Sequence, residues 1–236
     1  MIAVLDAPSN LGLRPPSAER EPGVRGLAGA LRACGVVERL GARDAGVVAP
    51  PPYSFEMASN REGIARYSLS LAARIGDLLD SRDFPVVLGG DCSILLGAGV
   101  ALKRRGRYGL AFVDGHLDFR NLEWAPAVGA VAGEDLAVVT GHAEPSLADL
   151  DGLAPYFAEA DVVAIGEREG DASERRALAS TAITVRDLAE LRPASTGSTA
   201  RLPQPRRSTS GTGTPRSPTR PRAWRGSSKP PIAPRL

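Results

Sequence analysis

Two short polar clusters carry residue types and spacings that suit metal chemistry. The segment 89–93 (GGDCS) contains a carboxylate and a thiol, and the segment 114–118 (DGHLD) contains two carboxylates and an imidazole. The three polar residues of DGHLD alternate at i, i+2 and i+4, so an extended backbone projects their side chains to one side. Such donors suit a divalent cation such as Mn²⁺, Fe²⁺ or Zn²⁺. A solvated loop with a chance histidine is the alternative interpretation.

Each cluster directly follows a short apolar run, Val86–Leu88 for the first and Leu110–Val113 for the second. Continuous apolar runs bounded by turn residues indicate parallel strands that are buried on both faces. The intervening segment 94–102 has the length of a crossover helix. Since binding sites of open α/β sheets lie beyond the carboxyl ends of the strands, both clusters are expected at that edge.

The two motifs together resemble the GGDHS and DAHxD motifs of the ureohydrolase family, which contains the arginases and agmatinases, in the same order and at the usual separation. The segments 5–12 (LDAPSNLG) and 162–169 (VVAIGERE) also resemble family segments. The resemblance covers about residues 1–192. It implies a three-layer α/β/α fold with a mainly parallel sheet. It also implies a two-manganese site whose hydroxide attacks a guanidinium carbon.

On this resemblance Asp114, His116 and Asp118 are expected as metal ligands and as the catalytic residues. Cys92 stands where most members have a liganding histidine, and we expect it as a further ligand. A thiolate binds Mn²⁺ poorly, so Zn²⁺ and Fe²⁺ stay open beside Mn²⁺. Asp91 is expected to orient its neighbours. The substrate-binding residues remain unassigned.

Two departures from the family pattern bear on activity. Ala132 stands where members place a histidine near the substrate, and no D-x-D sequence follows Asp187, where members supply two bridging carboxylates. We therefore expect a hydrolase that cleaves a C–N bond of a guanidino or amidino compound and releases urea or a related product, with impaired activity in this chain. The alternative is a non-catalytic relative that binds a metal, a small ligand or a protein.

The chain changes character at about residue 193. Residues 1–192 carry 20 basic and 27 acidic side chains, whereas residues 193–236 contain nine prolines, nine Lys and Arg, and no acidic residue. A segment of this composition cannot bury enough apolar surface to fold, so we expect a disordered tail. It could be a basic arm, an inert extension or an out-of-frame continuation, and we favour the last. The arginase-like domain, residues 1–192, is then incomplete at its C-terminus.

Hydrophobic periodicity and turn residues predict the remaining elements. The amino terminus, residues 1–6, is predicted as a strand, and the turn-rich segment 7–16 after it lies where binding loops occur, although a plain surface loop is our interpretation for each single residue. The segment 120–133 is predicted as an irregular lid or binding loop. Helices are predicted at 22–34 (ended by Gly35), 60–80, 134–140, 174–180 and from 185 to 191, and further strands at 45–48, 162–166 and 182–185.

Composition and charge limit the partners. The run Lys103–Arg107 could bind nucleic acid, but cations at a helix end ordinarily complement its dipole, and we favour that role. His142 is interpreted in the same way, or as a surface residue. The absence of a signal sequence, a long apolar run and a disulfide framework predicts a cytoplasmic protein away from membranes. We expect a small guanidino or amidino substrate and keep a homo-oligomer open.

Overall fold

A computed structural model describes residues 1–120, 130–168 and 172–187, and the predicted tail lies outside them. The chain divides into the units Met1–Arg192 and Pro193–Leu236, and all described residues belong to the first. Its elements, in chain order, are β1 (Ile2–Ala7), η1 (Gly23–Gly26), α1 (Leu27–Ala33), α2 (Val36–Arg39), β2 (Arg43–Val47), α3 (Met57–Asp80), β3 (Phe84–Gly89), α4 (Ile94–Lys103), β4 (Leu110–Val113), η2 (Val131–Gly133), α5 (Asp135–Val139), α6 (Pro145–Ala148), η3 (Leu150–Gly152), η4 (Glu159–Asp161), β5 (Val162–Glu167), α7 (Ala172–Leu178) and β6 (Thr184–Asp187).

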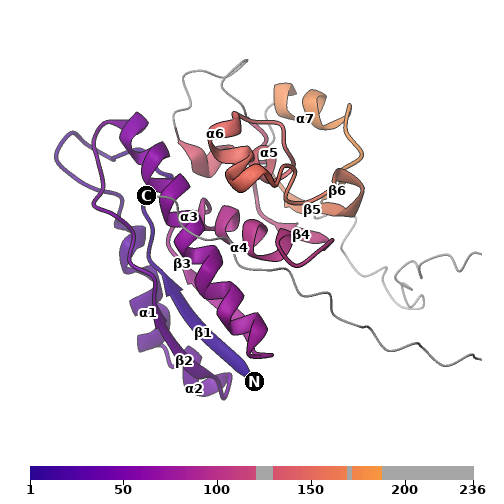
Figure 1. Cartoon of the computed structure of the whole chain (residues 1–236). Helices are drawn as coiled ribbons and strands as arrows, with labels where there is room; N and C mark the ends of the chain where they lie inside the picture. Colours follow the sequence, from indigo (N-terminus) through magenta and orange to yellow (C-terminus); the bar gives the residue numbers. More distant parts are fainter. Residues whose placement is uncertain (121–129, 169–171, 188–236) are drawn as a thin grey trace, which may run out of the picture. The chain divides into compact units, whose positions relative to one another are not determined.

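Strand β1 is the centre of a three-stranded parallel sheet with the order β2-β1-β3. It pairs with β3 in continuous register from Ile2 opposite Phe84 to Ala7 opposite Gly89. Side chains alternate between the two faces of a strand. Leu5 accordingly packs in the large core with α3 and α4, while Val4 packs in a smaller cluster that contains Ala28 of α1. Figure 1 shows α1 and α3 on opposite sides of β1.

Helices α3 and α4 lie against each other (Figure 1). A Cβ on Gly97 of α4 would lie 2.8 Å from Leu71 Cδ2 of α3, so the glycine permits this close approach. The predicted helix 60–80 is confirmed, and it begins three residues earlier, at Met57. The predicted helix 22–34 consists of η1 followed by α1, and Gly35, with φ of +76°, ends it as expected.

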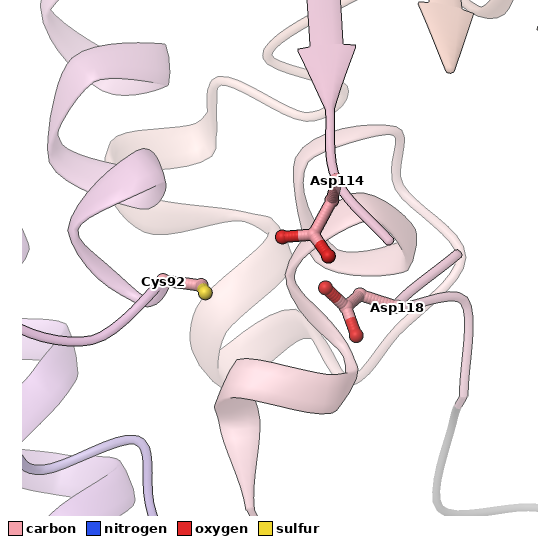
Figure 2. A group of neighbouring side chains, drawn as sticks. All are labelled: Cys92, Asp114 and Asp118. Carbon is pink, nitrogen blue, oxygen red and sulfur yellow. The ribbon is translucent and has the colours of Figure 1, made fainter. Parts of the chain in front are cut away.

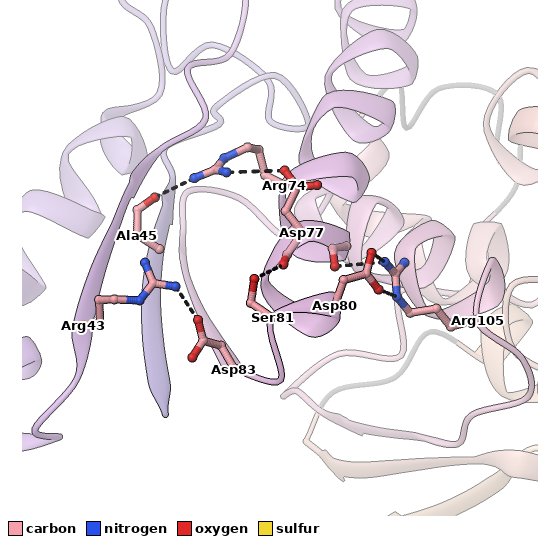
Figure 3. A network of polar contacts seen from close by, with 9 residues as sticks. Arg43, Ala45, Arg74, Asp77, Asp80, Ser81, Asp83 and Arg105 are labelled. Carbon is pink, nitrogen blue, oxygen red and sulfur yellow. Dashed lines mark hydrogen bonds and ion pairs between the residues drawn. The ribbon is translucent and has the colours of Figure 1, made fainter.

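A network of charged side chains ties the end of α3 to its neighbours (Figure 3). Arg74 Nη2 donates to the carbonyl of Ala45 in β2 at 3.0 Å. Arg105 lies in the basic run after α4, and its Nη2 donates to Asp80 at 2.7 Å and to the carbonyl of Gly76 at 2.9 Å. Its Nη1 donates to the carbonyl of Ala101 at the end of α4 at 3.1 Å. These contacts support the helix-end role of the basic run.

The second sheet is also parallel and has the order β4-β5-β6. Leu110 of β4 lies opposite Val162 of β5, and Val163 lies opposite Thr184 of β6. The predicted strands are confirmed, but β6 runs from Thr184 to Asp187 instead of over 182–185, so the helix predicted from residue 185 is wrong over 185–187. The rest of that prediction lies outside the described residues, as do residues 121–129 of the predicted irregular loop.

The structure confirms the predicted α/β class with parallel strands, although the strands form two sheets. Within the described residues β3 and β4 each pair on one side only. A cavity of about 270 Å³ lies between them, with mostly apolar walls. The apolar walls belong to β3, α4 and β4, and they include Val87, Ile94, Leu95, Ala98, Leu110, Phe112 and Val113. None of the helices in the described part of the chain combines the length and apolar character needed to cross a membrane.

Candidate metal site

The loop after β3 is fixed by a buried carboxylate. Asp91 is 3% exposed, and its Oδ2 accepts hydrogen bonds from the Ser9 hydroxyl at 2.8 Å and the Gly12 amide at 3.2 Å. Its Oδ1 accepts one from the Ser93 amide at 2.9 Å. A Cβ on Gly90 would lie 2.1 Å from the Ser9 carbonyl oxygen, so glycine alone permits this approach of the two loops. Asp91 therefore makes the contacts that an orienting residue needs.

The loop after β1 is buried at its centre. Ser9, Asn10 and Leu11 are all essentially inaccessible to solvent, and Ser9 contacts the loop after β3. Our interpretation of each residue as part of a plain surface loop is therefore wrong for these three. Polar side chains that satisfy a buried partner can lie inside without a large penalty, and the turn-rich composition alone does not reveal such a partner.

The loop after β4 starts as an extension of the strand. The Asp114 amide donates to the carbonyl of Ile165 in β5 at 3.0 Å, which continues the ladder by one residue. Asp114 Oδ1 accepts a hydrogen bond from the amide of His116 at 2.9 Å, so the backbone turns here. The His116 side chain is 63% exposed, and its Nδ1 lies 3.5 Å from Asp114 Oδ1.

Asp118 has left-handed backbone geometry, with φ of +46°. The predicted extended backbone through this loop is therefore wrong at Asp118. The physical reason is the contact with α5, because the Ala137 amide donates to the Asp118 carbonyl at 3.3 Å and the chain must turn to reach it. The neighbours Leu117 and Phe119 are buried in the core and anchor the loop.

The two loops bring Cys92, Asp114 and Asp118 together (Figure 2). One ligand atom from each residue lies within 4.8 Å of the others. His116 is not part of this group, although the sequence pattern placed it with the two aspartates. The arrangement combines a side chain from the end of β3 with two from the end of β4, at the sheet edge where the chemistry was expected.

The site concentrates negative charge. Burial, followed by the carboxylate of Asp114, raises the pKa of Asp118 to about 7. Cys92 is partly exposed to solvent. Partial burial nevertheless raises the pKa of its thiol to about 12, followed by the negative charges of Asp135, Asp118 and Asp114. Without a cation Cys92 is therefore a neutral thiol at pH 7 and a poor nucleophile.

Asp135 is the residue that the sequence analysis missed. It is 1% exposed, and burial and then the charges of Asp118 and Asp114 raise its pKa well above the ordinary value. An acidic residue in the first turn of a helix ordinarily complements the dipole, so the sequence around Asp135 gives no sign of another role. Only the fold brings this carboxylate beside the two motifs.

Two other positions singled out in the sequence lie near the site. The amide of Ala132, the position that the resemblance aligns with a histidine, donates to the carbonyl of Gly12 at 3.0 Å, so Ala132 contacts the loop after β1. His142 Nε2 lies 2.6 Å from Glu159 Oε1, and its ring packs on Phe119 at a centroid distance of 5.1 Å. These contacts give His142 a structural role next to the Asp118 loop.

The donor set fits a divalent cation. Two carboxylates and a thiol lie close enough to share one ion, and their mutual repulsion disfavours full ionisation without one. Carboxylate oxygens suit Mn²⁺, whereas the sulfur of Cys92 favours Zn²⁺. A parallel α/β domain with this set of donors at the carboxyl ends of two strands has the features of a metal-dependent enzyme domain.

Comparison with known proteins identifies the family of this chain. The sequence model of the Arginase family matches residues 18–205. The arginase of Bacillus subtilis (strain 168) is 34% identical over 138 residues, which are 58% of this chain and 46% of that protein. The arginase of Bacillus caldovelox is 34% identical over 134 residues, 56% of this chain and 44% of that protein. The chain belongs to the arginase family.

Solved structures agree in fold. The crystal structure of the Bacillus subtilis arginase matches with a TM-score of 0.71 and 28% identity, covering 81% of this chain and 64% of that one. The native structure of the Bacillus caldovelox arginase at pH 5.6 also gives a TM-score of 0.71, with 27% identity, covering 80% of this chain and 65% of that one. The chain spans about half the length of the two curated arginases named above.

Proposed function

We propose that this chain is a metal-dependent hydrolase of the arginase type that cleaves a C–N bond in a guanidino or amidino compound and releases urea or a related product. The observation that carries the proposal is the meeting of Cys92, Asp114 and Asp118 within 4.8 Å at the ends of β3 and β4. Membership of the arginase family supports the reaction class.

The residues have distinct roles in this proposal. Cys92, Asp114 and Asp118 hold the cation, which, when bound, lowers the pKa of a coordinated water. Asp91 holds the loop that carries Cys92, because its two oxygens accept hydrogen bonds from three donors. His116 faces solvent beside Asp114, and we keep it as a ligand or a proton carrier on the open side. The carboxylates also attract a positively charged guanidinium group.

We propose that turnover is low. Within the described residues the cluster of three offers ligands for one cation, and the sequence from Asp187 to Leu236 contains no D-x-D that could hold a second. A mechanism that needs two cations loses transition-state stabilisation when one is missing, and each ~1.4 kcal/mol lost reduces the rate about tenfold. We expect rates well below the roughly 1–10³ per second of typical enzymes.

A second candidate function is a non-catalytic relative that binds a metal without turnover. The thiol of Cys92 at the cation position favours it, because a thiolate suits structural Zn²⁺ better than hydrolytic Mn²⁺.

Self-association of the chain is a further prediction. It is checked by sedimentation of the purified protein with and without metal.

The test uses the full chain, stripped with EDTA and reloaded with Mn²⁺, Zn²⁺ or Fe²⁺. Urea release is measured with arginine, agmatine and guanidinobutyrate, and metal content is measured in parallel. Bound metal with urea release above that of an Asp114→Asn/Asp118→Asn variant supports the hydrolase. Bound metal without urea release supports the second candidate, and no bound metal overturns both.

A further inference from the structure

Asp135 opens helix α5 as a buried carboxylate that lacks a full set of partners. Its Oδ1 accepts a hydrogen bond from the Leu136 amide at 3.1 Å. Its Oδ2 has no hydrogen-bond partner in the described part of the chain. Leaving such an oxygen buried without a donor costs free energy, and buried polar atoms in proteins are nearly always paired. The exception therefore needs a physical reason.

Two other buried carboxylates near Asp135 have cationic partners. Glu134, the residue immediately before Asp135, lies 2.9 Å from Arg61, and Glu174 lies 2.6 Å from Arg120. Among the described residues, those that line the same cavity as Asp135 include no Lys or Arg. Glu134 also has one buried oxygen, Oε1, without a hydrogen-bond partner, but its other oxygen pairs with Arg61. Asp135 differs from both neighbours in having no cationic side chain against it among the described residues.

The surroundings of Asp135 indicate where that cation binds. Asp135 and Cys92 line the same cavity, whose remaining walls are apolar. Helix α5 is attached to the DGHLD loop through the hydrogen bond from the Ala137 amide to the Asp118 carbonyl. Asp135 is not one of the three residues whose ligand atoms all lie within 4.8 Å of one another. The cavity that it shares with Cys92 nevertheless places it on the same side of the two loops as that group.

We propose that Asp135 supplies a fourth anionic group to the cation held by Cys92, Asp114 and Asp118, reaching the ion directly or through one bound water. This inference rests on the proposed cation site but not on turnover. It assigns to the first turn of α5 a part in metal binding that the two sequence motifs do not contain. The cost of burying Asp135 in the metal-free chain is then offset when the ion binds.

The test compares Asp135→Asn with Glu134→Gln, two variants that each remove one buried carboxylate at adjacent positions. Binding of Zn²⁺ alone and of Mn²⁺ alone to the EDTA-treated full chain is measured by calorimetry. Loss of a group that supports a metal ligand typically costs 10- to 100-fold in affinity, so Asp135→Asn should bind at least about tenfold more weakly. Glu134→Gln should bind the metals with wild-type affinity.

Thermal unfolding in EDTA gives an independent measurement. Asp135→Asn should unfold at a higher temperature than wild type, because it removes a carboxyl oxygen that is buried without a hydrogen-bond donor. Glu134→Gln should unfold at a lower temperature, because it leaves Arg61 without its buried partner. Wild-type metal affinity in Asp135→Asn would overturn the proposal, and so would its failure to fold in EDTA, since a group kept for the metal is dispensable without it.

The result is separable from the proposed hydrolase. Weaker metal binding by Asp135→Asn, together with no urea release by wild type, keeps this inference and rejects the hydrolase. Urea release by wild type, together with unchanged metal affinity in Asp135→Asn, keeps the hydrolase and rejects this inference. The two proposals therefore fail on different measurements.

Discussion

The loops after β3 and β4 both carry aspartates, but they use them in opposite ways. Asp91, after β3, is buried and accepts hydrogen bonds from the Ser9 hydroxyl and from the amides of Gly12 and Ser93. Asp118, after β4, is also buried, yet burial and the nearby Asp114 carboxylate raise its pKa to about 7. The protein itself satisfies the first carboxylate. The second lacks that support, and a cation is the partner that would supply it.

The comparison teaches that neighbouring acidic motifs can be sorted by what stabilises their charge. A carboxylate with several amide and hydroxyl donors supports the scaffold, and its removal costs stability. A carboxylate crowded by other carboxylates destabilises the metal-free fold, and it stabilises the protein only when an ion binds. The variants below test this division, from the largest expected effect to the smallest.

Replacement of the satisfied carboxylate should have the largest effect. Asp91→Ala leaves three donors without an acceptor, two of them in the loop after β1. Since each unsatisfied buried donor costs ~1–3 kcal/mol, the free energy of unfolding should fall by about 3–5 kcal/mol. Urea unfolding of the metal-free chain measures it. A loss smaller than that caused by a surface substitution would end the distinction between the two loops.

The pH dependence of the metal-free chain should come next. The folded pKa of Asp118 lies above its ordinary value of 3.8, so folding is favoured when this carboxyl is protonated. Stability should therefore fall as pH rises from about 4 to about 7, by on the order of 3 kcal/mol. Asp118→Asn should remove much of this pH dependence. Its free energy of unfolding should therefore exceed that of wild type at pH 8 and equal it near pH 4. Urea unfolding across this range in EDTA measures it, and a steeper pH dependence in Asp118→Asn would contradict the account.

Gly90→Ala should destabilise the chain to a smaller extent. The added Cβ would lie 2.1 Å from the Ser9 carbonyl oxygen, so the loops after β1 and β3 must separate. Forced overpacking typically costs ~1–3 kcal/mol. Thermal unfolding should show this loss, with Gly29→Ala as the control, because nothing lies within 4 Å of a Cβ at Gly29. Equal unfolding temperatures for the two variants would show that the loop contact is not tight.

His116→Ala should have the smallest effect on stability. The side chain is mostly exposed, and substitutions of this kind usually change the free energy of unfolding by less than ~0.5 kcal/mol. If His116 is a ligand, as the sequence pattern predicts, metal affinity should nevertheless fall. Calorimetric titration of this variant with Mn²⁺ and with Zn²⁺ decides the point. Unchanged affinity for both ions would remove His116 from the proposed ligand set.

The sequence predicted the parts of the fold that depend on local pattern. The apolar runs at Val86–Leu88 and Leu110–Val113 correctly placed β3 and β4, and periodicity correctly placed α3. The sequence pattern did not predict that β3 and β4 belong to separate sheets, because strand pairing depends on which strand edges meet in space. The short helices α2 and α6 were missed, since four residues are too few to establish a period.

The site shows the same limit. Spacing within one loop placed Asp114 and Asp118 together, and the family resemblance added Cys92. It also grouped His116 with them by assuming an extended backbone, which the left-handed conformation of Asp118 excludes. Asp135 escaped notice because its position depends on how α5 packs against the loop, and no local pattern records that packing.

The most direct test of the account is metal titration of the EDTA-treated full chain by calorimetry, with metal content measured after dialysis. Wild type should bind about one divalent ion per chain. Asp114→Asn/Asp118→Asn should lose this binding, while Asp80→Asn/Asp161→Asn should retain it. The control removes the same charge from two aspartates that pair with Arg105 and Arg107 away from the motif loops. Equal metal content in wild type and Asp114→Asn/Asp118→Asn would contradict the claim that these carboxylates form a cation site.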